Sequence, residues 1–402
     1  MTALALLSLS VLCFTVVHSA YIADNPPARG GCIIDVNRDF TFKHPLLLQP
    51  NASTFILPSH SDGVQLFAGQ KARLVCAGNR LKLANVQEVE ITCLTGDRFR
   101  VNNSSLGERR FKELLCTNYP KPWAQRTGRK CLNQFSEIEI GFKTSKGFVR
   151  VILVCFDPQR MDSVYSVYNL TAHIGNSQYN VPRPGDFITA DFYPNLNPQP
   201  STLYTRKSER TNLARIIGQQ LAQKYIANKG DYFLSRGHLT AKADFVYGAQ
   251  QRATFFYVNV APQWQTFNGN NWNELEMSCR RFAEKSKRDL TVYTGVHGHA
   301  KLDDKSLYLF TGNTNYKLTV PAVFWKVLHD PVTKAGIAFV GHNNPYDTTD
   351  VTMLCTNICN KVNWLSWDAK NITAGYSYCC DVTELQRVVQ EIPDIPVHGL
   401  LS

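Results

Sequence analysis

Apolar and polar residues alternate with a period of two along much of the first half of the chain. The stretches 88–93 and 137–143 both place Val, Ile, Cys or Phe at every second position. Because successive side chains of a strand point to opposite faces, this period predicts strands with one buried face. The run 148–156 is mostly apolar and predicts a more buried strand. We expect residues 21–180 to form an all-β N-terminal domain, in which we find no catalytic constellation.

The segment 181–202 interrupts this pattern with prolines and asparagines. Its prolines are Pro182, Pro184, Pro194, Pro198 and Pro200. Proline lacks the backbone N–H that a sheet ladder requires, so this composition predicts a linker. We therefore place a domain boundary here and expect a second domain over residues 203–402.

Helical spacing appears in that second part. A helix capped by Thr211 or Asn212 is expected to bury one apolar face. That face would hold Leu213, Ile216, Ile217 and Leu221. A β-rich run at 253–260, a polar loop at 265–271 and a helix from about 272 to 285 follow. The coarse order of this second part is therefore strand, loop, strand, loop, helix.

Residues 1–20 have the pattern of a secretory signal peptide. The apolar run from Ala3 to Val17 is uncharged and ends in small residues at Ser19 and Ala20. Removing this segment takes Cys13 away and leaves 11 of the 12 cysteines. In an oxidising compartment most of these form disulfides, and the odd number leaves at least one thiol free or paired between chains. We expect a soluble, secreted protein that does not reside in a membrane.

Glycosylation and charge fit an extracellular protein. The sequons lie at Asn51, Asn102, Asn103, Asn169 and Asn371. The net charge is +11, and none of it comes from the first twenty residues. A basic secreted protein meets polyanions, which include nucleic acid, heparin-like glycans and anionic membranes, and charge alone does not choose among them.

The segment Ser235-Arg236-Gly237-His238 combines a cation with a base. Phosphodiester cleavage requires a base that activates water and cations that neutralise charge on the phosphorus. The glycine allows a tight backbone, so that both side chains can face one site. A histidine near a strand end is more often a hydrogen-bonded structural residue, so the tripeptide by itself is weak evidence.

A second group of polar residues surrounds the start of the later helix. Asn268 lies just before it, where an amide oxygen can bind a hard cation, and magnesium needs few protein oxygens because it keeps several waters. Glu276 and Arg280 are four residues apart, so they project from one face of the helix.

These motifs resemble the DNA/RNA non-specific endonucleases of the ββα-metal (His-Me finger) superfamily, and among them the secreted insect double-stranded ribonucleases. The resemblance covers roughly 203–396. It is carried by YFLSRGHL at 232–239, ADFVYGAQQ at 243–251, VNVAPQ at 258–263, FN at 267–268, WNELE at 272–276 and GYSYCC at 375–380. Asn268 follows His238 by thirty positions, Glu276 follows Asn268 by eight and Arg280 follows by four more, which is the register of the bacterial members.

The resemblance implies an α+β fold, in which a ββα-metal nuclease domain has a mixed or antiparallel sheet and flanking helices. It also implies a role for each of these residues. His238 would take a proton from the attacking water, and Asn268 would hold Mg²⁺, for which Mn²⁺ can substitute. Glu276 would orient water around the metal, Arg236 and Arg280 would pair with phosphate oxygens, and Asn259 would support the histidine or the local backbone. The partner would be DNA or RNA without sequence preference, and the products would carry 5′-phosphate ends.

Two departures from the bacterial pattern keep an alternative open. Ser235 stands where those members have aspartate, and Thr240 lies in a segment, 239–242, where they have Ala-Pro. The alternative is therefore a secreted nucleic-acid-binding protein of the same fold with weak or no catalysis. A glycan-binding or structural β-domain protein is a third hypothesis, which depends on the unassigned first part.

Other chemistry-bearing groups have simpler interpretations. His297-Gly298-His299 could present a pair of zinc ligands, but a surface turn is favoured because no Asp or Cys lies at ligand spacing. The cysteines at 355, 359, 379 and 380 favour disulfides over a metal site in a secreted chain. Aromatic residues between 255 and 272 could stack on bases, but their spacing favours the core. Disulfide connectivity and oligomeric state do not follow from the sequence.

Overall fold

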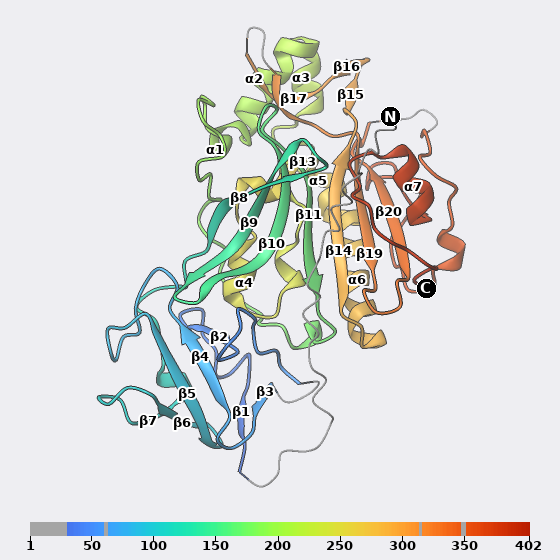
Figure 1. The fold of residues 1–402 in the computed structure, drawn as a ribbon. Coiled ribbons are helices and arrows are strands. Elements are labelled where there is room, and N and C mark those ends of the chain that lie inside the picture. The colour runs from blue at the N-terminus through green and yellow to red at the C-terminus, as the bar shows by residue number, and fades with distance from the viewer. Residues whose placement is uncertain (1–29, 60–62, 313–315, 347–350) are drawn as a thin grey trace, which may run out of the picture.

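The computed structural model describes residues 30–59, 63–312, 316–346 and 351–402. The signal peptide expected at 1–20 lies outside these ranges. Figure 1 shows a small β region at the lower left and a larger body that contains a long sheet with helices on its faces.

The small β region contains a five-stranded sheet in the order β2-β4-β5-β6-β7 and a separate two-stranded ribbon, β1-β3. The strands are β1 (Cys32–Ile34), β2 (Leu46–Leu48), β3 (Val64–Leu66), β4 (Lys71–Val75), β5 (Glu88–Thr95), β6 (Arg98–Val101) and β7 (Glu108–Arg110). In β5 the residues Val89, Ile91 and Cys93 are buried and alternate with half-buried ones. The period of two in 88–93 is thereby confirmed as a strand with one buried face.

The larger body is organised on an antiparallel sheet with the strand order β21-β20-β19-β14-β11-β10-β9-β8. Its strands are β8 (Trp123–Cys131), β9 (Phe135–Thr144), β10 (Gly147–Asp157), β11 (Asp162–Leu170), β14 (Leu290–His297), β19 (Val323–His329), β20 (Gly336–His342) and β21 (Ser377–Cys380). Neighbouring residues of β19 show how the core is divided. Phe324 and Leu328 belong to one buried cluster, and Trp325 and Val327 belong to another. The sheet is therefore covered on both faces.

This sheet corrects the boundary expected at 181–202. Strands β8–β11, which the sequence assigns to the N-terminal domain, belong to this sheet, and β11 pairs with β14 through the register from Tyr165↔Gly295 to Leu170↔Leu290. The separate β region ends before β8, so the strands of the expected domain 21–180 are divided between that region and the eight-stranded sheet. The physical reason is that strand pairing between residues more than a hundred positions apart leaves no local signal in the sequence. The prolines of 181–202 mark a crossing segment between paired strands and not an inter-domain linker.

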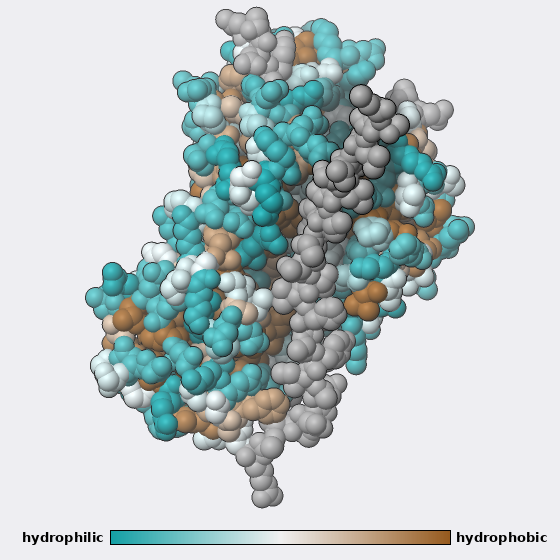
Figure 2. Space-filling model, in the orientation of Figure 1, coloured by the Kyte–Doolittle hydropathy of each residue, from teal (hydrophilic) through white to brown (hydrophobic). Residues whose placement is uncertain are grey.

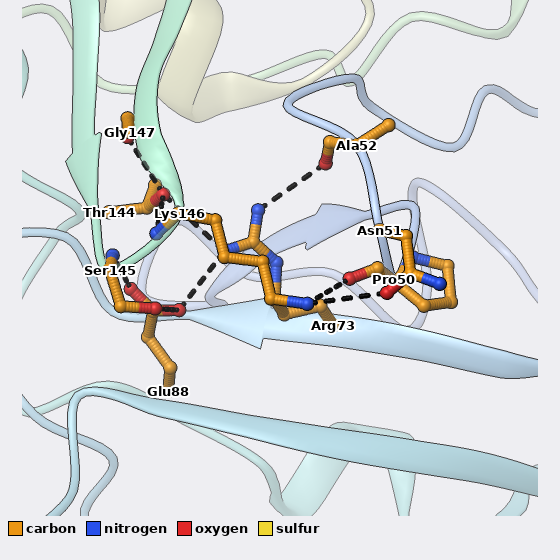
Figure 3. A network of polar contacts seen from close by, with 9 residues as sticks. All are labelled: Pro50, Asn51, Ala52, Arg73, Glu88, Thr144, Ser145, Lys146 and Gly147. Atoms are coloured by element: carbon orange, nitrogen blue, oxygen red, sulfur yellow. Dashed lines mark hydrogen bonds and ion pairs between the residues drawn. The ribbon is translucent and has the colours of Figure 1, made fainter.

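A polar network ties the β region to the β9–β10 turn (Figure 3). Arg73 on β4 donates from Nη1 to the Glu88 carboxylate at 3.1 Å and to the Thr144 hydroxyl at 3.4 Å. Glu88 also accepts the Ser145 backbone N–H at 2.6 Å and the Ser145 hydroxyl at 2.7 Å. The Arg73 and Glu88 side chains are only 6% and 15% exposed, so their ion pair is poorly screened by solvent. These contacts attach the two parts of the chain to each other.

Short ribbons and helices complete the body. The ribbons pair β12 (Leu234–His238) with β13 (Val260–Trp264), β15 (Lys301–Leu302) with β16 (Lys305–Ser306), and β17 (Tyr308–Thr311) with β18 (Tyr316–Thr319). The helices are α1 (Pro200–Leu203), α2 (Arg206–Ile217), α3 (Gln219–Tyr225), α4 (Gly248–Ala253), α5 (Gln265–Phe267), α6 (Asn273–Ser286) and α7 (Val382–Val388). Helix α6 contributes to the core on the Phe324 face of the sheet, and α7 contributes to the core on the Trp325 face.

The local predictions for the second part are confirmed in one place and wrong in two. Helix α6 lies within one residue of the expected 272–285 at each end. Helix α2, however, begins at Arg206 with Thr205 as its N-cap, because its first turn is wholly polar and the apolar period starts only later. The run 253–260 is not a strand, since residues 257–259 form a 3₁₀ turn and β13 starts at Val260.

The expectation of disulfides is confirmed. The structure contains Cys32–Cys93, Cys76–Cys116, Cys131–Cys155, Cys355–Cys380 and Cys359–Cys379. Among the described residues Cys279 is the free thiol, and it is buried in α6. Such bonds indicate that the chain folds in an oxidising compartment.

The surface is predominantly hydrophilic on the face seen in Figure 2. Apolar side chains appear there as small separate patches, several of them over the β region at the lower left. Within the described ranges, none of the helices combines the length and the hydropathy that a membrane crossing requires.

Candidate active site

The Arg-Gly-His segment lies on β12, which pairs with β13 in the register Arg236↔Pro262, Gly237↔Ala261 and His238↔Val260. Alternation along the strand places Arg236 and His238 on one face of this ribbon and Gly237 on the other. A Cβ atom at Gly237 would lie 2.3 Å from Gln263 Oε1 and 2.5 Å from Gln263 Cβ. Gly237 is therefore required by the close approach of Gln263, and not by an unusual backbone angle.

His238 lies between two aromatic rings. Its ring centroid is 5.2 Å from that of Phe187 and 5.1 Å from that of Phe255. The Nε2 atom is buried and has no hydrogen-bond partner in the described part of the chain. Burial, helped by the charges of Arg183 and Arg236, lowers the pKa of His238 to about 4. The imidazole is therefore neutral at physiological pH, which is the form that accepts a proton.

Arg236 lies over the rings of Phe187, Tyr204 and Tyr257, at 5.2, 5.9 and 5.7 Å from their centroids. No salt bridge involves its guanidinium within the described ranges, and its Nε is buried without a hydrogen-bond partner. A guanidinium that has no salt bridge and lies two positions from the base is suited to a phosphate oxygen.

Asn259 is fully buried at the end of the 3₁₀ turn that precedes β13. Its Nδ2 donates to the carbonyls of Thr240 at 3.0 Å and Thr254 at 2.9 Å, and its Oδ1 accepts the Thr240 N–H at 3.1 Å. These bonds use all of the amide hydrogens. Asn259 therefore holds the backbone just after His238, and in this arrangement it has no group to offer a substrate.

Asn268 begins the irregular turn 268–272 that leads into α6, and it contacts β12 through Ser235. Its Nδ2 donates to the Ser235 hydroxyl at 3.1 Å and lies 3.5 Å from Gln265 Oε1. Ser235 in turn donates to the Gln263 carbonyl at 2.9 Å. Both amide contacts use the nitrogen, so the amide oxygen of Asn268 is left to bind a cation or water.

The donor set fits a magnesium ion that is held by few protein oxygens. The described residues contain no cluster of three or more His, Cys, Asp or Glu side chains able to hold a metal. A zinc site built from several such ligands is therefore not found in the described part of the chain. A hard cation bound by one amide oxygen and several waters is consistent with the free Oδ1 of Asn268.

Glu276 and Arg280 lie on α6, as the spacing predicts, together with two residues from elsewhere in the chain. Arg280 donates from Nη1 to Asp244 at 2.6 Å, and Asp244 also accepts a hydrogen bond from the Tyr168 hydroxyl. Burial acts to lower the pKa of Arg280, but the carboxylates of Asp244 and Glu276 outweigh it and raise this pKa. At least one N–H group of the Arg280 guanidinium is therefore already bonded to the buried carboxylate of Asp244.

Burial and the negative charge of Asp244 raise the pKa of Glu276 to about 7, against the opposing effect of Lys326 and Arg280. Lys326 is 1% exposed, donates to the Thr294 hydroxyl at 2.6 Å and lies 5.3 Å from the Trp272 ring. It comes from β19, on the face of the sheet that α6 covers. Lys326 supplies a buried positive charge beside Glu276.

The structure gathers the expected residues into three contacting groups. These are His238 with Arg236, Asn268 with Ser235, and Glu276 with Arg280. In the described residues no hydrogen bond or ion pair joins His238 to Asn268 or Glu276. Sequence analysis missed Phe187 and Lys326. Lys326 could have been noticed as a single cation inside an apolar strand. No feature of the sequence distinguishes Phe187, which lies in the proline-rich segment.

The other candidate groups have structural roles. His297 contacts Glu391 at 2.8 Å, and His299 contacts the Tyr308 hydroxyl at 3.2 Å, so the two histidines do not share partners. The aromatic residues Phe255, Phe256, Tyr257, Trp264 and Trp272 are all buried, which confirms their expected place in the core.

Comparison with known proteins decides the family. The family model described as DNA/RNA non-specific endonuclease matches residues 136–385, which is more than half of the chain. The chain belongs to the DNA/RNA non-specific endonuclease family. It is therefore an enzyme that hydrolyses phosphodiesters. The matched span begins in β9, in agreement with a sheet that extends across residues 181–202.

Relatives of this endonuclease include salivary proteins of biting flies. The salivary endonuclease of Lutzomyia longipalpis is 27% identical over 395 residues, which cover 95% of this chain and 89% of that protein. The salivary protein Tsal2A of Glossina morsitans morsitans is 26% identical over 390 residues, covering 93% and 95% respectively. A crystal structure of the EndoG/EndoGI complex is 18% identical, covers 62% of this chain and 87% of that chain, and has a TM-score of 0.37. The salivary relatives and the disulfides together indicate secretion.

Proposed function

We propose that this chain is a secreted, magnesium-dependent endonuclease that cleaves DNA and double-stranded RNA without base preference, with His238 as the general base. The observation that carries the proposal is the pairing of a neutral imidazole with an unpaired guanidinium on one face of β12. The ligand requirements of magnesium and the free oxygen of Asn268 support the choice of metal, and Mn²⁺ meets the same requirements. The likeness to insect double-stranded ribonucleases supports the choice of RNA as a second substrate.

In the proposed reaction His238 takes a proton from water as the water oxygen attacks the phosphorus. The bond between phosphorus and the 3′-oxygen breaks, and the 3′-oxygen takes a proton from solvent, to which His238 later returns its own. The product keeps a 5′-phosphate. Arg236 binds a non-bridging oxygen and stabilises the charge that develops there. Positioned base catalysis is worth about 10²–10⁴-fold in rate.

The metal and the helix residues have separate tasks. Asn268 would hold the cation through Oδ1, and the cation supplies Lewis-acid stabilisation of the departing 3′-oxygen. Glu276 in its ionised form orients water near Asn268 by accepting hydrogen bonds. Arg280 is kept in place by Asp244 and directs its remaining N–H groups toward the substrate.

A second candidate function is nucleic-acid binding with little catalysis, and one observation favours it. Nε2 of His238 is inaccessible to solvent, with Phe187 and Phe255 on either side of the ring. Water has to reach this buried atom before His238 can act as a base. A chain in which Phe187 stays in place would bind nucleic acid and leave it uncut.

Cleavage of plasmid DNA and long double-stranded RNA distinguishes the two functions. Purified full-length protein is assayed with Mg²⁺ or with EDTA, beside His238→Ala. We expect the wild type to cut both substrates only with metal, and the variant to bind both and to cut at least 100-fold more slowly. A wild-type protein that retards nucleic acid on a gel and never shortens it would establish the binding function instead.

A further inference from the structure

Two cations next to the active site are tied to consecutive carbonyl groups of the proline-rich segment. Lys242, in the 3₁₀ turn that follows β12, donates from Nζ to the Val181 carbonyl at 2.8 Å. Arg252, on α4, donates from Nη1 to the Pro182 carbonyl at 2.9 Å. The next residue of the segment is a third cation, the exposed Arg183. Tertiary contacts thus collect Lys242, Arg252 and Arg183 from three separate elements; these residues are called the cationic triad below.

The cationic triad is not neutralised by the protein. Within the described ranges no salt bridge pairs any of its three members with a carboxylate. Burial and the neighbouring positive charges of Arg183 and Arg252 lower the pKa of Lys242, so both arginines lie close enough to repel the Lys242 ammonium. An anion placed between them would relieve this repulsion and find unused N–H donors, since Lys242 and Arg252 each have more donors than the one carbonyl bond described above uses.

The triad is continuous with the catalytic residues. Arg183 is close enough to His238 to contribute to the lowering of its pKa. Lys242 follows His238 by four residues, and Asn259 fixes the backbone between them through its bonds to Thr240. On the outer side, Arg252 lies 4.0 Å from the centroid of the Tyr119 ring, a residue between the β region and β8. The row of cations therefore leads from the base toward the N-terminal part of the molecule.

We propose that Lys242, Arg252 and Arg183 form a subsite for backbone phosphates of the nucleic acid strand that flanks the phosphodiester held at His238. The choice of nucleic acid as the ligand rests on the proposed function. Such a subsite recognises the charge of the phosphates and not the base sequence, because its donors are side-chain N–H groups of Lys and Arg that bind an anion. A sulfated glycan would be the other polyanion, but adjacency to a phosphodiester-cleaving base favours the strand that this base cuts.

The triad is tested by the salt dependence of binding, in which each phosphate contact contributes about −0.9 to the slope of log K against log salt concentration. The variants are Lys242→Gln, Arg252→Gln and their double, which remove charge but keep an N–H donor for the carbonyl groups. Lys361→Gln, in the 3₁₀ turn 359–361 beside β21, removes an exposed charge at the opposite edge of the sheet and serves as the matched control. Affinity for a labelled 30-base-pair duplex is measured by anisotropy in the His238→Ala background, and again on the wild-type background in EDTA.

We expect the slope to become less negative by about 0.9 in each single variant and by about twice that in the double. Lys361→Gln should leave it unchanged, and Lys242→Arg should restore it. Salt-dependence slopes that stay unchanged while the melting midpoint falls would overturn the proposal. The cations would then only hold the proline-rich segment in place and would not bind phosphate. A loss confined to heparin binding would overturn it in favour of a glycan site. If the wild type binds with the expected slopes and never cleaves, the subsite stands and the proposed function fails.

Discussion

The side-chain amide of Asn268 donates from Nδ2 to the hydroxyl of Ser235, 3.1 Å away. The Ser235 hydroxyl donates its own hydrogen bond to the Gln263 carbonyl on β13, so it can only accept from Asn268. This chain of bonds fixes which end of the amide faces β12 and leaves Oδ1 as the atom for a cation. A serine thereby fills a position at which bacterial relatives have aspartate.

Replacing Ser235 with alanine is expected to weaken metal binding. The amide of Asn268 loses its acceptor and can rotate, and one hydrogen bond is worth about 0.5–1.5 kcal/mol, or roughly 2- to 12-fold in affinity. Mn²⁺ binding followed by electron paramagnetic resonance measures the effect without relying on turnover. Ser235→Thr keeps the hydroxyl and should retain the affinity. Equal affinity in wild type and Ser235→Ala would show that the amide is held by other contacts.

Replacing Phe187 with alanine is expected to expose His238 and to raise its pKa from about 4 toward the ordinary value of 6.5, since burial is the main cause of the lowering. Cleavage at pH 7.5 should then increase, because water gains access to the ring while the imidazole is still mostly neutral. Histidine NMR titration measures the pKa, and plasmid cleavage measures the rate. Tyr179→Ala, at a side chain 66% exposed in the neighbouring segment, is the control. A His238 pKa that stays near 4 would mean that Phe255 and the rest of the pocket exclude water without Phe187.

The pH dependence of cleavage should have its acid limb near pH 7, set by Glu276 and not by His238. Burial and Asp244 raise the pKa of Glu276 to about 7, so its ionised form is lost as the pH falls through 7. His238 remains neutral down to about pH 4. In Glu276→Gln the rate should be lower, and its acid limb should move toward pH 4. If the acid limb of Glu276→Gln stays near pH 7, the group that sets this limb is not Glu276.

Replacing Asp244 with asparagine is expected to destabilise the fold by roughly 3–5 kcal/mol, because it leaves the guanidinium of Arg280 without its buried counter-charge. Chemical denaturation measures the free energy of unfolding. Asp97→Asn removes the partner of Arg110 from an exposed pair 3.7 Å long and should cost no more than about 1 kcal/mol. Equal effects of the two substitutions would show that the Asp244–Arg280 pair contributes little to stability.

Regular patterns with a short period were readable from the sequence. The alternation in 88–93 and 137–143 corresponds to the buried faces of β5 and β9, and the apolar spacing after Trp272 corresponds to α6. Each of these elements buries one face against a neighbour, and burial of every second or every third to fourth residue leaves a direct trace in the sequence. Where the first turn of α2 is polar, no such trace exists, and the start of that helix was placed too late.

The chemistry of the site was readable because its residue types and their spacing are local. His238 and Arg236 share one strand face since they are two positions apart, and Glu276 and Arg280 share one helix face since they are four apart. Of the two roles expected for Asn259, the structure favours support of the local backbone, because its amide is bonded to the backbone of Thr240 and Thr254. The assignment of catalytic roles stays a prediction until the variants are measured.

The sequence by itself determined that the chain is a disulfide-bonded endonuclease of this family, because residue types at fixed spacings along one strand and one helix are local properties. The tertiary structure alone decided that β8–β11 join the nuclease sheet, that Phe187 lies against His238, and that Lys326 lies beside Glu276. Each of these contacts joins residues that are many positions apart. Such contacts depend on how whole faces pack, and one sequence contains no periodic signal that records which faces meet.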